Sequence, residues 1–380
     1  MVARCAALML GSGMSETRAT LPGRDYHAPD TFELERERIF FRHWMYVARA
    51  DEAPEPGDFA VVDVAGESIL VVRGKDEELR AFYNVCRHRG SRLCDAESAG
   101  HAKGSIRCPY HAWSYAYDGR LTGTPFVAED ELDRASLSLW PVRLDVWQGF
   151  VFVNLGDDPV SLRESLELQY DKPLQYERWE MGELRTARRT VSELAANWKI
   201  VVENYNECLH CPTVHPELCT VAPTFGKGLA LEPGRDDWGV SIAGGGVGYT
   251  ATGTTNVPVM PGIDERSASS MYGATVLPNM LIDLTGTVVI ATRLQPRSAT
   301  HTTIVTDYLF RPEVVEDPDF DATEVVEFAE LVAHQDYVVC ERAQLGVMSR
   351  AFDHGVYPEK DDLVYGFNQR YLAARDGHDS

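Results

Sequence analysis

Cys86-Arg87-His88 and, after a gap of 19 residues, Cys108-Pro109-Tyr110-His111 form the stretch of sequence that decides the fold. Each half places one cysteine beside one histidine. An iron–sulfur cluster held by two thiolates and two imidazoles needs one such pair from each of two loops. The runner-up is a structural zinc site with two cysteines and two histidines. Zinc sites usually pair like with like, so the alternating order favours the cluster, and four unrelated core residues are favoured least.

The two segments are similar to the cluster loops of the Rieske family. The resemblance rests on CRHRG, CPYHAWSY and the Asp118-Gly119 that follows them. It implies that a [2Fe–2S] cluster is bound by Cys86, His88, Cys108 and His111. The gap is a residue or two longer than expected for the oxygenase branch. We expect the extra length in residues 97–104, where a tip rich in small residues tolerates insertion.

Bulk composition limits the classes of function. The 380 residues suffice for two domains, and no apolar run approaches the 18 residues of a membrane span. A net charge of −22 disfavours binding to nucleic acid or to an anionic membrane surface. The eight cysteines show no disulfide framework. We therefore expect a cytoplasmic protein with reduced thiols.

Short alternating runs in the first half predict a small antiparallel β domain over residues 45–158. Residues 1–25 are expected to be flexible. A helix capped by Asp30, with Glu33 as its return partner, should follow and extend through residue 44. The expected strands are 59–64, 68–72, 79–84, 137–144 and 150–154.

The second half predicts a different domain, formed by residues 26–44 together with 159–380. Helices are expected at 161–170, 193–209 and 319–350, and strands at 185–192, 275–283, 288–294 and 302–310. Residues 221–270 should be mostly loop. The predicted fold class is α+β: an all-β N-terminal domain, then an antiparallel sheet flanked by helices in a helix-grip-like arrangement.

A second cluster of metal-binding residue types begins at Glu203. On the expected helix, Glu203, Glu207 and His210 would share one face. Pro212 should break that helix near Cys211, which lets His215 return beside His210. Two imidazoles plus one carboxylate form the facial triad of non-haem Fe(II) oxygenases. Taken alone, this stretch fits two independent histidines equally well.

This stretch resembles a motif of the Rieske non-haem iron oxygenases, in their alpha (oxygenase) subunit. The motif is Glu-Asn-x-x-(Asp or Glu)-x-x-His-x4-His, preceded here by Asn197-Trp198-Lys199. The resemblance covers about residues 20 to 370 and implies a mononuclear iron bound by His210, His215 and Asp336. Glu341 is the competitor for the last position, and a neighbouring or ion-pair role suits it better. For Glu207 the resemblance implies a bridge to a cluster histidine of the next subunit.

Glutamate at position 207, the string VENYNECLHCPTVHP and Leu277-Pro278-Asn279 resemble the branch that acts on glycine betaine or carnitine. This implies an O₂-dependent monooxygenase that hydroxylates or N-demethylates a small quaternary or tertiary amine. It also implies a homotrimer in which the cluster of one subunit serves the iron of the next. The sequence shows no nucleotide-binding fingerprint, so electrons from NAD(P)H should arrive through a separate flavin- or ferredoxin-type reductase.

Three rival functions stay open at this stage. The first is an aromatic ring-hydroxylating oxygenase, which can be a dioxygenase. The second is a Rieske electron carrier, although over 200 residues beyond the cluster domain would then lack a role. The third is a zinc-stabilised binding protein. A quaternary ammonium would favour an aromatic cage; ordinary packing is nevertheless the favoured interpretation of Tyr205, Trp238, Tyr249 and Tyr272.

Overall fold

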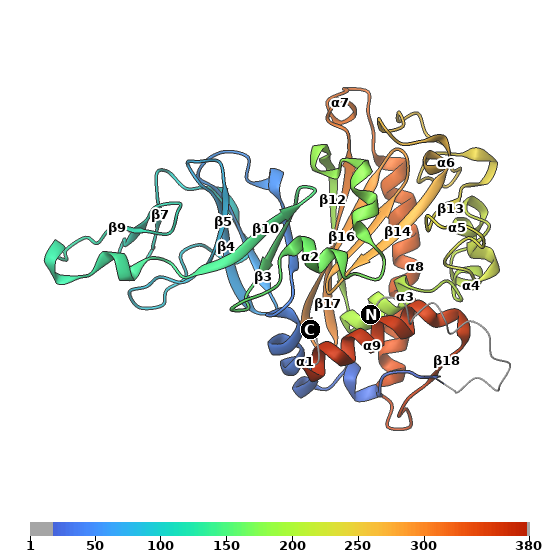
Figure 1. Cartoon of the computed structure of the whole chain (residues 1–380), viewed down its shortest axis with the longest axis horizontal. Helices are drawn as coiled ribbons and strands as arrows, with labels where there is room; N and C mark the ends of the chain where they lie inside the picture. The colour runs from blue at the N-terminus through green and yellow to red at the C-terminus, as the bar shows by residue number, and fades with distance from the viewer. Residues whose placement is uncertain (1–17, 378–380) are drawn as a thin grey trace.

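The computed structural model describes residues 18–377 of the chain, which form a β-rich part and an α+β part (Figure 1). The β-rich part contains a seven-stranded sheet in the order β2-β11-β10-β5-β4-β3-β6 and a three-stranded sheet β7-β8-β9. The strands of the larger sheet are β2 Met45–Arg49, β3 Asp58–Val64, β4 Glu67–Arg73, β5 Leu79–Tyr83, β6 Ala99–His101, β10 Pro141–Trp147 and β11 Phe150–Asn154. Those of the smaller sheet are β7 Ile106–Arg107, β8 Ser114–Tyr115 and β9 Leu121–Gly123.

The α+β part is built on a six-stranded antiparallel sheet in the order β12-β17-β16-β15-β14-β13. Its strands are β12 Arg185–Leu194, β13 Val240–Ser241, β14 Ser270–Val276, β15 Met280–Leu284, β16 Val289–Ser298 and β17 His301–Phe310. A two-stranded sheet pairs β1 Arg18–Ala19 with β18 Val356–Tyr357. The α-helices are α1 Pro29–Glu35, α2 Leu162–Glu167, α3 Trp198–Tyr205, α4 Cys211–Val214, α5 Pro216–Val221, α6 Glu265–Ala268, α7 Pro312–Val315, α8 Thr323–Val347 and α9 Asp362–Asp376.

Strand β17 is the most continuously buried strand of the six-stranded sheet. It lies between β12 and β16, and every residue after His301 in it is buried. Its run of threonine, isoleucine and valine suits a pleated surface that is covered on both faces. The long helix α8 lies across this sheet (Figure 1) and packs Val325, Phe328 and Val332 into the core. The sheet and α8 thereby form a rigid support for the side chains on their facing surfaces.

Helix α8 is also tied to α3 by buried polar contacts. Gln344 accepts a hydrogen bond from the Asn197 backbone N–H at 2.8 Å and donates one to the Tyr26 carbonyl at 3.1 Å. Asn197 caps α3 because its side chain accepts from Lys199 N–H at 2.9 Å. These contacts fix α3 against α8.

Several predicted elements are wrong. The helix expected over 193–209 is shorter than predicted and consists of α3 alone. Glu193 and Leu194 belong to β12 and pair with β17, and Asn197 caps the start of the helix. The strand expected over 275–283 is the hairpin β14–β15, which turns at a cis Leu277–Pro278 bond. The first helix begins at Pro29 without a side-chain cap, since Asp30 pairs instead with Arg24. Helix α9 was not predicted.

The predicted flexible segment 1–25 lies outside the described residues up to position 17. From Arg18 onward the chain is held against the C-terminal region: Arg18 is opposite Tyr357 in the small sheet, and Asp25 pairs with Arg375 at 2.8 Å. The prediction of flexibility is therefore wrong for residues 18–25. Within residues 18–377 no helix combines the length and apolar character that crossing a membrane requires.

Candidate functional site

Three side chains from two distant segments converge on one point. His210 directly precedes α4, His215 directly follows it, and Asp336 projects from the middle of α8. Asp336 Oδ1 lies 2.9 Å from His215 Nε2 and 3.3 Å from His210 Nε2, and the two nitrogens are 3.1 Å apart. At a zinc-like metal–ligand distance of about 2.1 Å, two ligands at right angles lie about 3.0 Å apart. The three atoms are thus spaced to hold one divalent ion on one face.

The chain path between the histidines explains this convergence. Helix α3 ends at Tyr205, and a turn then leads to the short helix α4, whose first turn contains Pro212. The break thus comes earlier than the expected position near Cys211, and Glu203, Glu207 and His210 do not share a helix face. Because α4 is only four residues long, His210 and His215 flank it and their rings meet at 5.0 Å between centroids.

Hydrogen bonds to the second ring nitrogen orient both imidazoles. His210 Nδ1–H donates to the Glu207 carboxylate, and His215 Nδ1–H donates to Gln335 Oε1 at 2.8 Å. Each bond leaves the Nε2 lone pair free for a metal. Asn204 orients the carboxylate in a similar way, because its Nδ2–H donates to Asp336 Oδ1 at 2.8 Å.

The charges at this point favour binding of a cation. Burial alone would lower the pKa of His210, but its hydrogen bonds to Asp336 and Glu207 raise that pKa to about 9. Burial would likewise raise the pKa of Asp336, yet the two histidines hold it below its ordinary value. A bound divalent ion would take the place of the proton that the carboxylates attract.

The two Cys–His pairs lie in two loops of the β-rich part, at the end that lies away from the six-stranded sheet (Figure 1). Cys86 and Cys108 are buried, and Cys86 Sγ lies 3.3 Å from the Tyr115 hydroxyl. The rings of His88 and His111 meet at 4.7 Å between centroids. The structure thereby brings together all four residues that the sequence predicted for a cluster.

The histidines of these loops are more exposed than the cysteines: His111 is half-buried, whereas both cysteines are buried. His88 is exposed and stacks on Trp113 at 4.7 Å with an interplanar angle of 7°. Backbone hydrogen bonds hold each loop, among them Gly90 N–H to Cys86 O at 3.0 Å. Gly90 has a φ of 73°, which a side chain would disfavour. A centre held here would have its histidine side open to another molecule.

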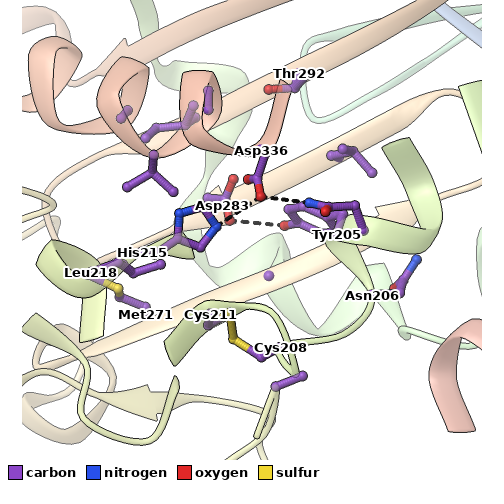
Figure 2. Close-up of a pocket in the computed structure, with 18 of the residues that line it drawn as sticks. Tyr205, Asn206, Cys208, Cys211, His215, Leu218, Met271, Asp283, Thr292 and Asp336 are labelled. Atoms are coloured by element: carbon purple, nitrogen blue, oxygen red, sulfur yellow. Dashed lines mark hydrogen bonds and ion pairs between the residues drawn. A yellow bond between two sulfur atoms is a disulfide. The ribbon is translucent and has the colours of Figure 1, made fainter. Parts of the chain in front are cut away.

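A cavity of about 230 Å³ lies beside the His210–His215–Asp336 group (Figure 2). The cavity is lined by all four aromatic residues that the sequence suggested for an aromatic cage: Tyr205, Trp238, Tyr249 and Tyr272. Cys208 and Cys211, which are joined by a disulfide, also line it. The expectation that no cysteines pair is wrong at this position, because the turn between α3 and α4 brings the two residues together.

Helix α8 also carries Glu341, which the sequence had offered as a ligand, and Gln335, which it had not. Glu341, the competitor for the third position, accepts from the Ala195 backbone N–H at 3.2 Å and is not part of the group. Gln335 and Asn204 were given no role. Asn204 stood inside the motif that drew attention to this stretch; nothing in the sequence around Gln335 indicated its contact with His215.

Two family models match the chain in succession. The Rieske [2Fe-2S] domain matches residues 43–141, and the catalytic domain of the ring hydroxylating alpha subunit matches residues 181–376. The chain is 42% identical over 200 residues to the carnitine monooxygenase oxygenase subunit of Escherichia coli K12. That match covers only 52% of this chain and 52% of the relative, so the matched part spans about half the length of that curated relative.

Longer matches cover nearly the whole chain. The glycine betaine monooxygenase oxygenase subunit of Chromohalobacter salexigens is 30% identical over 367 residues, which cover 89% of this chain and 81% of the relative. The crystal structure of the quaternary ammonium Rieske monooxygenase CntA with an inhibitor superimposes with a TM-score of 0.77. It is 25% identical and covers 94% of this chain and 96% of that one. The predicted α+β fold class is confirmed.

These families imply a [2Fe–2S] cluster in the first domain and a mononuclear non-haem iron that uses O₂ in the second. The donor sets fit both groups. Two buried cysteines and two less buried histidines suit a cluster ligated by two thiolates and two imidazoles. Two imidazoles and one carboxylate, spaced about 3 Å apart, suit iron. The chain belongs to the family of Rieske-type ring-hydroxylating oxygenase alpha subunits.

Proposed function

We propose that the protein is the oxygenase component of a Rieske non-haem iron system that hydroxylates or N-demethylates a small quaternary or tertiary amine. The observation that carries this proposal is the cavity beside His210, His215 and Asp336. Its volume of about 230 Å³ suits a small molecule better than a multi-ring arene. Four aromatic side chains line it, and aromatic rings are the groups that attract an ammonium ion. The relatives named for carnitine and glycine betaine support the same substrate class.

The proposed ligand sets follow from the site geometry. Cys86, His88, Cys108 and His111 would hold the cluster, and His210, His215 and Asp336 would hold the iron. When bound, the iron would supply activation of O₂ and the cluster would supply electrons one at a time. The protein side chains orient these groups: Glu207 and Gln335 fix the imidazole tautomers, and Asn204 fixes the carboxylate.

The proposed electron path runs between subunits. Figure 1 shows the cluster loops and the α3–α8 region at opposite ends of one chain. A head-to-tail homotrimer would place His88 or His111 of one subunit near Glu207 of the next. Glu207 is suited to the bridge because its carboxylate already contacts His210 and is partly exposed. The relatives are named as oxygenase subunits, which supports a separate reductase as the electron donor.

Turnover with defined substrates tests the proposed function. Purified protein, a generic flavin reductase and O₂ would be supplied with quaternary amines, betaines, carnitine and aromatic acids. Formaldehyde and hydroxylated products would be measured against O₂ consumed. The expected result is an oxygenated or demethylated amine in proportion to O₂, with no product from the aromatic acids. The Asp336→Ala variant should keep the cluster absorbance and form no product.

Two results would contradict the proposal. A hydroxylated or dihydroxylated arene without any amine product would assign the protein to aromatic ring hydroxylation. Electron transfer that continues unchanged in the Asp336→Ala variant, with no oxygenated product from any substrate, would assign it to electron carriage.

A further inference from the structure

Asp283 is a carboxylate that the proposed metal and cluster sites do not use. It lies on β15, where alternate residues face opposite sides of the sheet. Met280, Ile282 and Leu284 pack into the core on one side, whereas Leu281 and Asp283 line the cavity on the other. Figure 2 draws Asp283 in the group of cavity residues that includes Tyr205 and Asp336. An aspartate thus replaces the apolar residue expected at this position in a buried strand.

The structure gives Asp283 a hydrogen-bond donor but no positive partner. Tyr205 Oη lies 3.0 Å from Asp283 Oδ1 and also 3.0 Å from the Ile282 carbonyl. Within residues 18–377 no lysine, arginine or histidine forms an ion pair with this carboxylate. Burial, with a smaller contribution from the Asp336 charge, raises the pKa of Asp283 to about 7. A buried carboxylate without a counter-ion is costly, and a bound cation would remove that cost.

Asp283 borders the cavity of about 230 Å³, which such a cation could enter. Gly273 is directly opposite Asp283 on β14 and also lines the cavity. A Cβ at Gly273 would lie 2.9 Å from the Tyr205 hydroxyl, so the absence of a side chain lets this hydroxyl reach Asp283. Burial raises the pKa of the Tyr249 phenol, and the charge of the nearby Asp283 adds to this rise. Two aromatic residues therefore adjoin the carboxylate.

Apart from the two histidines of the proposed iron site, the cavity wall contains no basic side chain among the described residues. Among the described residues that line it there are five carboxylates and neither lysine nor arginine: Asp171, Glu207, Asp283, Glu330 and Asp336. The arginines just outside are engaged. Arg235 is held by Asp237 at 2.6 Å, and Arg370 donates to the Leu168 carbonyl at 3.1 Å in an adjoining hollow. Away from the proposed iron site, a substrate carboxylate would find no lysine or arginine in this wall.

We propose that Asp283 is the counter-ion for the ammonium group of the substrate, and that the preferred substrate is a net cation rather than a zwitterion. This rests on the proposed function, because it takes an amine oxygenase as given. Two neutral imidazoles and one carboxylate would leave a divalent ion with a positive charge, so a cation beside it needs a further carboxylate. The expected ligand differs from carnitine and glycine betaine, the zwitterions named for two relatives.

Binding without turnover provides the first test. Titration calorimetry on the holoenzyme without O₂ would compare choline with glycine betaine, which share a trimethylammonium head and differ in a hydroxymethyl or a carboxylate end. Choline should bind at least about tenfold more tightly. The Asp283→Asn variant keeps the acceptor for Tyr205 and removes the charge. It should lose about ten- to a hundredfold in choline affinity while its affinity for betaine changes little.

Matched variants separate a binding role from a structural one. Asp353→Asn, at a side chain that is 89% exposed, should leave both affinities unchanged. Tyr205→Phe keeps the Asp283 charge and should keep the preference for choline. In turnover, Asp283→Asn should raise KM for the cation more than it lowers kcat, and Asp283→Glu should restore part of the affinity. A structural role would instead affect choline and betaine equally.

The outcomes distinguish this inference from the proposed function. Equal binding of betaine and choline, or an Asp283→Asn variant with unchanged choline affinity, would overturn the inference while amine turnover stands. Amine binding absent from the wild-type protein, with products formed only from aromatic acids, would overturn both.

Discussion

At the scale of single residues, the clearest test concerns Asn204, which holds the Asp336 carboxylate with a hydrogen bond of 2.8 Å. Asn204→Ala removes that donor and lets the carboxylate rotate. We expect the affinity for mononuclear iron to fall about ten- to a hundredfold, because outer hydrogen bonds of this kind orient metal ligands. Iron retained during dialysis against a chelator would be measured, with acid-labile sulfide reporting the cluster.

A neighbouring surface histidine supplies the control for Asn204. His334 lies on α8 two residues before Asp336, and its side chain is 66% exposed. His334→Ala should retain iron as the wild type does, and both variants should retain full sulfide. Equal iron retention by Asn204→Ala and the wild type would show that the hydrogen bond does not orient the carboxylate.

The side chain of Glu203 should make the free energy of unfolding depend on pH. Burial raises its pKa from 4.5 to about 7, although Tyr26, Asn368 and Tyr357 donate hydrogen bonds to it and Lys199 adds a positive charge nearby. A raised pKa means that the folded protein binds this proton more tightly than the unfolded chain does. The contribution is therefore complete below pH 4.5 and is lost as the pH rises through about 7.

The Glu203→Gln variant should lack this dependence. The difference in free energy of unfolding between variant and wild type should shift by up to about 3 kcal/mol in favour of the variant between pH 4.5 and 8. Urea unfolding at a series of pH values measures it, and the difference cancels other groups that titrate in this range. A difference that stays constant with pH would refute the link.

The site residues differ in how well the sequence predicts them. Cys86, His88, Cys108 and His111 were identified from local spacing and resemblance, because each pair belongs to one loop. The pair His210 and His215 was also local. Asp336 needed the family resemblance, since 120 residues separate it from His215. Asn204 and Gln335 act through contacts made between α3 or α4 and α8, and no local pattern encodes such contacts.

At the scale of elements, α8 depends on the side chain of Gln344, which is 2% exposed. Gln344→Leu preserves much of the volume but leaves the Asn197 N–H and the Tyr26 carbonyl without their partner. Two buried polar groups left unpaired should lower the free energy of unfolding by about 2–4 kcal/mol. The next residue, Leu345, is 72% exposed, and Leu345→Gln should change stability by less than about 0.5 kcal/mol. Urea unfolding would measure the free energy of unfolding of both variants. Equal unfolding midpoints for the two would contradict the role given to Gln344.

The errors in predicting elements share one physical cause. Residues 193–194 have adequate helix propensity, yet they extend β12 because β17 supplies hydrogen-bond partners. The hairpin β14–β15 was predicted as one strand because both of its arms are apolar. Pairing across the sheet decided both cases. By contrast, β11 was predicted at its observed bounds, since the aromatic and β-branched run from Phe150 to Asn154 directly follows a Gly149 with positive φ.

At the scale of the whole molecule, the separation of the cluster loops from the α3–α8 region in Figure 1 supports our proposal that electrons leave one chain to reach iron in another. The exposed His88 of one subunit and the partly exposed Glu207 of the next are the residues that would meet at the contact between subunits. A mixture of two inactive variants tests this. His88→Ala removes a proposed cluster ligand, and Asp336→Ala removes a proposed iron ligand, so neither variant should turn over alone.

Co-expression of the two variants with different affinity tags would yield mixed particles that can be purified through both tags. In a head-to-tail ring, a contact is active only when an intact cluster faces an intact iron site on the next subunit. A trimer that carries both tags contains two subunits of one variant and one of the other, so one of its three contacts is active. Turnover should therefore return to about a third of the wild-type rate. Mixed particles with no turnover would instead place both centres of the path within one chain, despite their separation in the fold. Recovery near one third would identify the subunit contact as a part of the catalytic unit, because no single chain could then carry out the reaction.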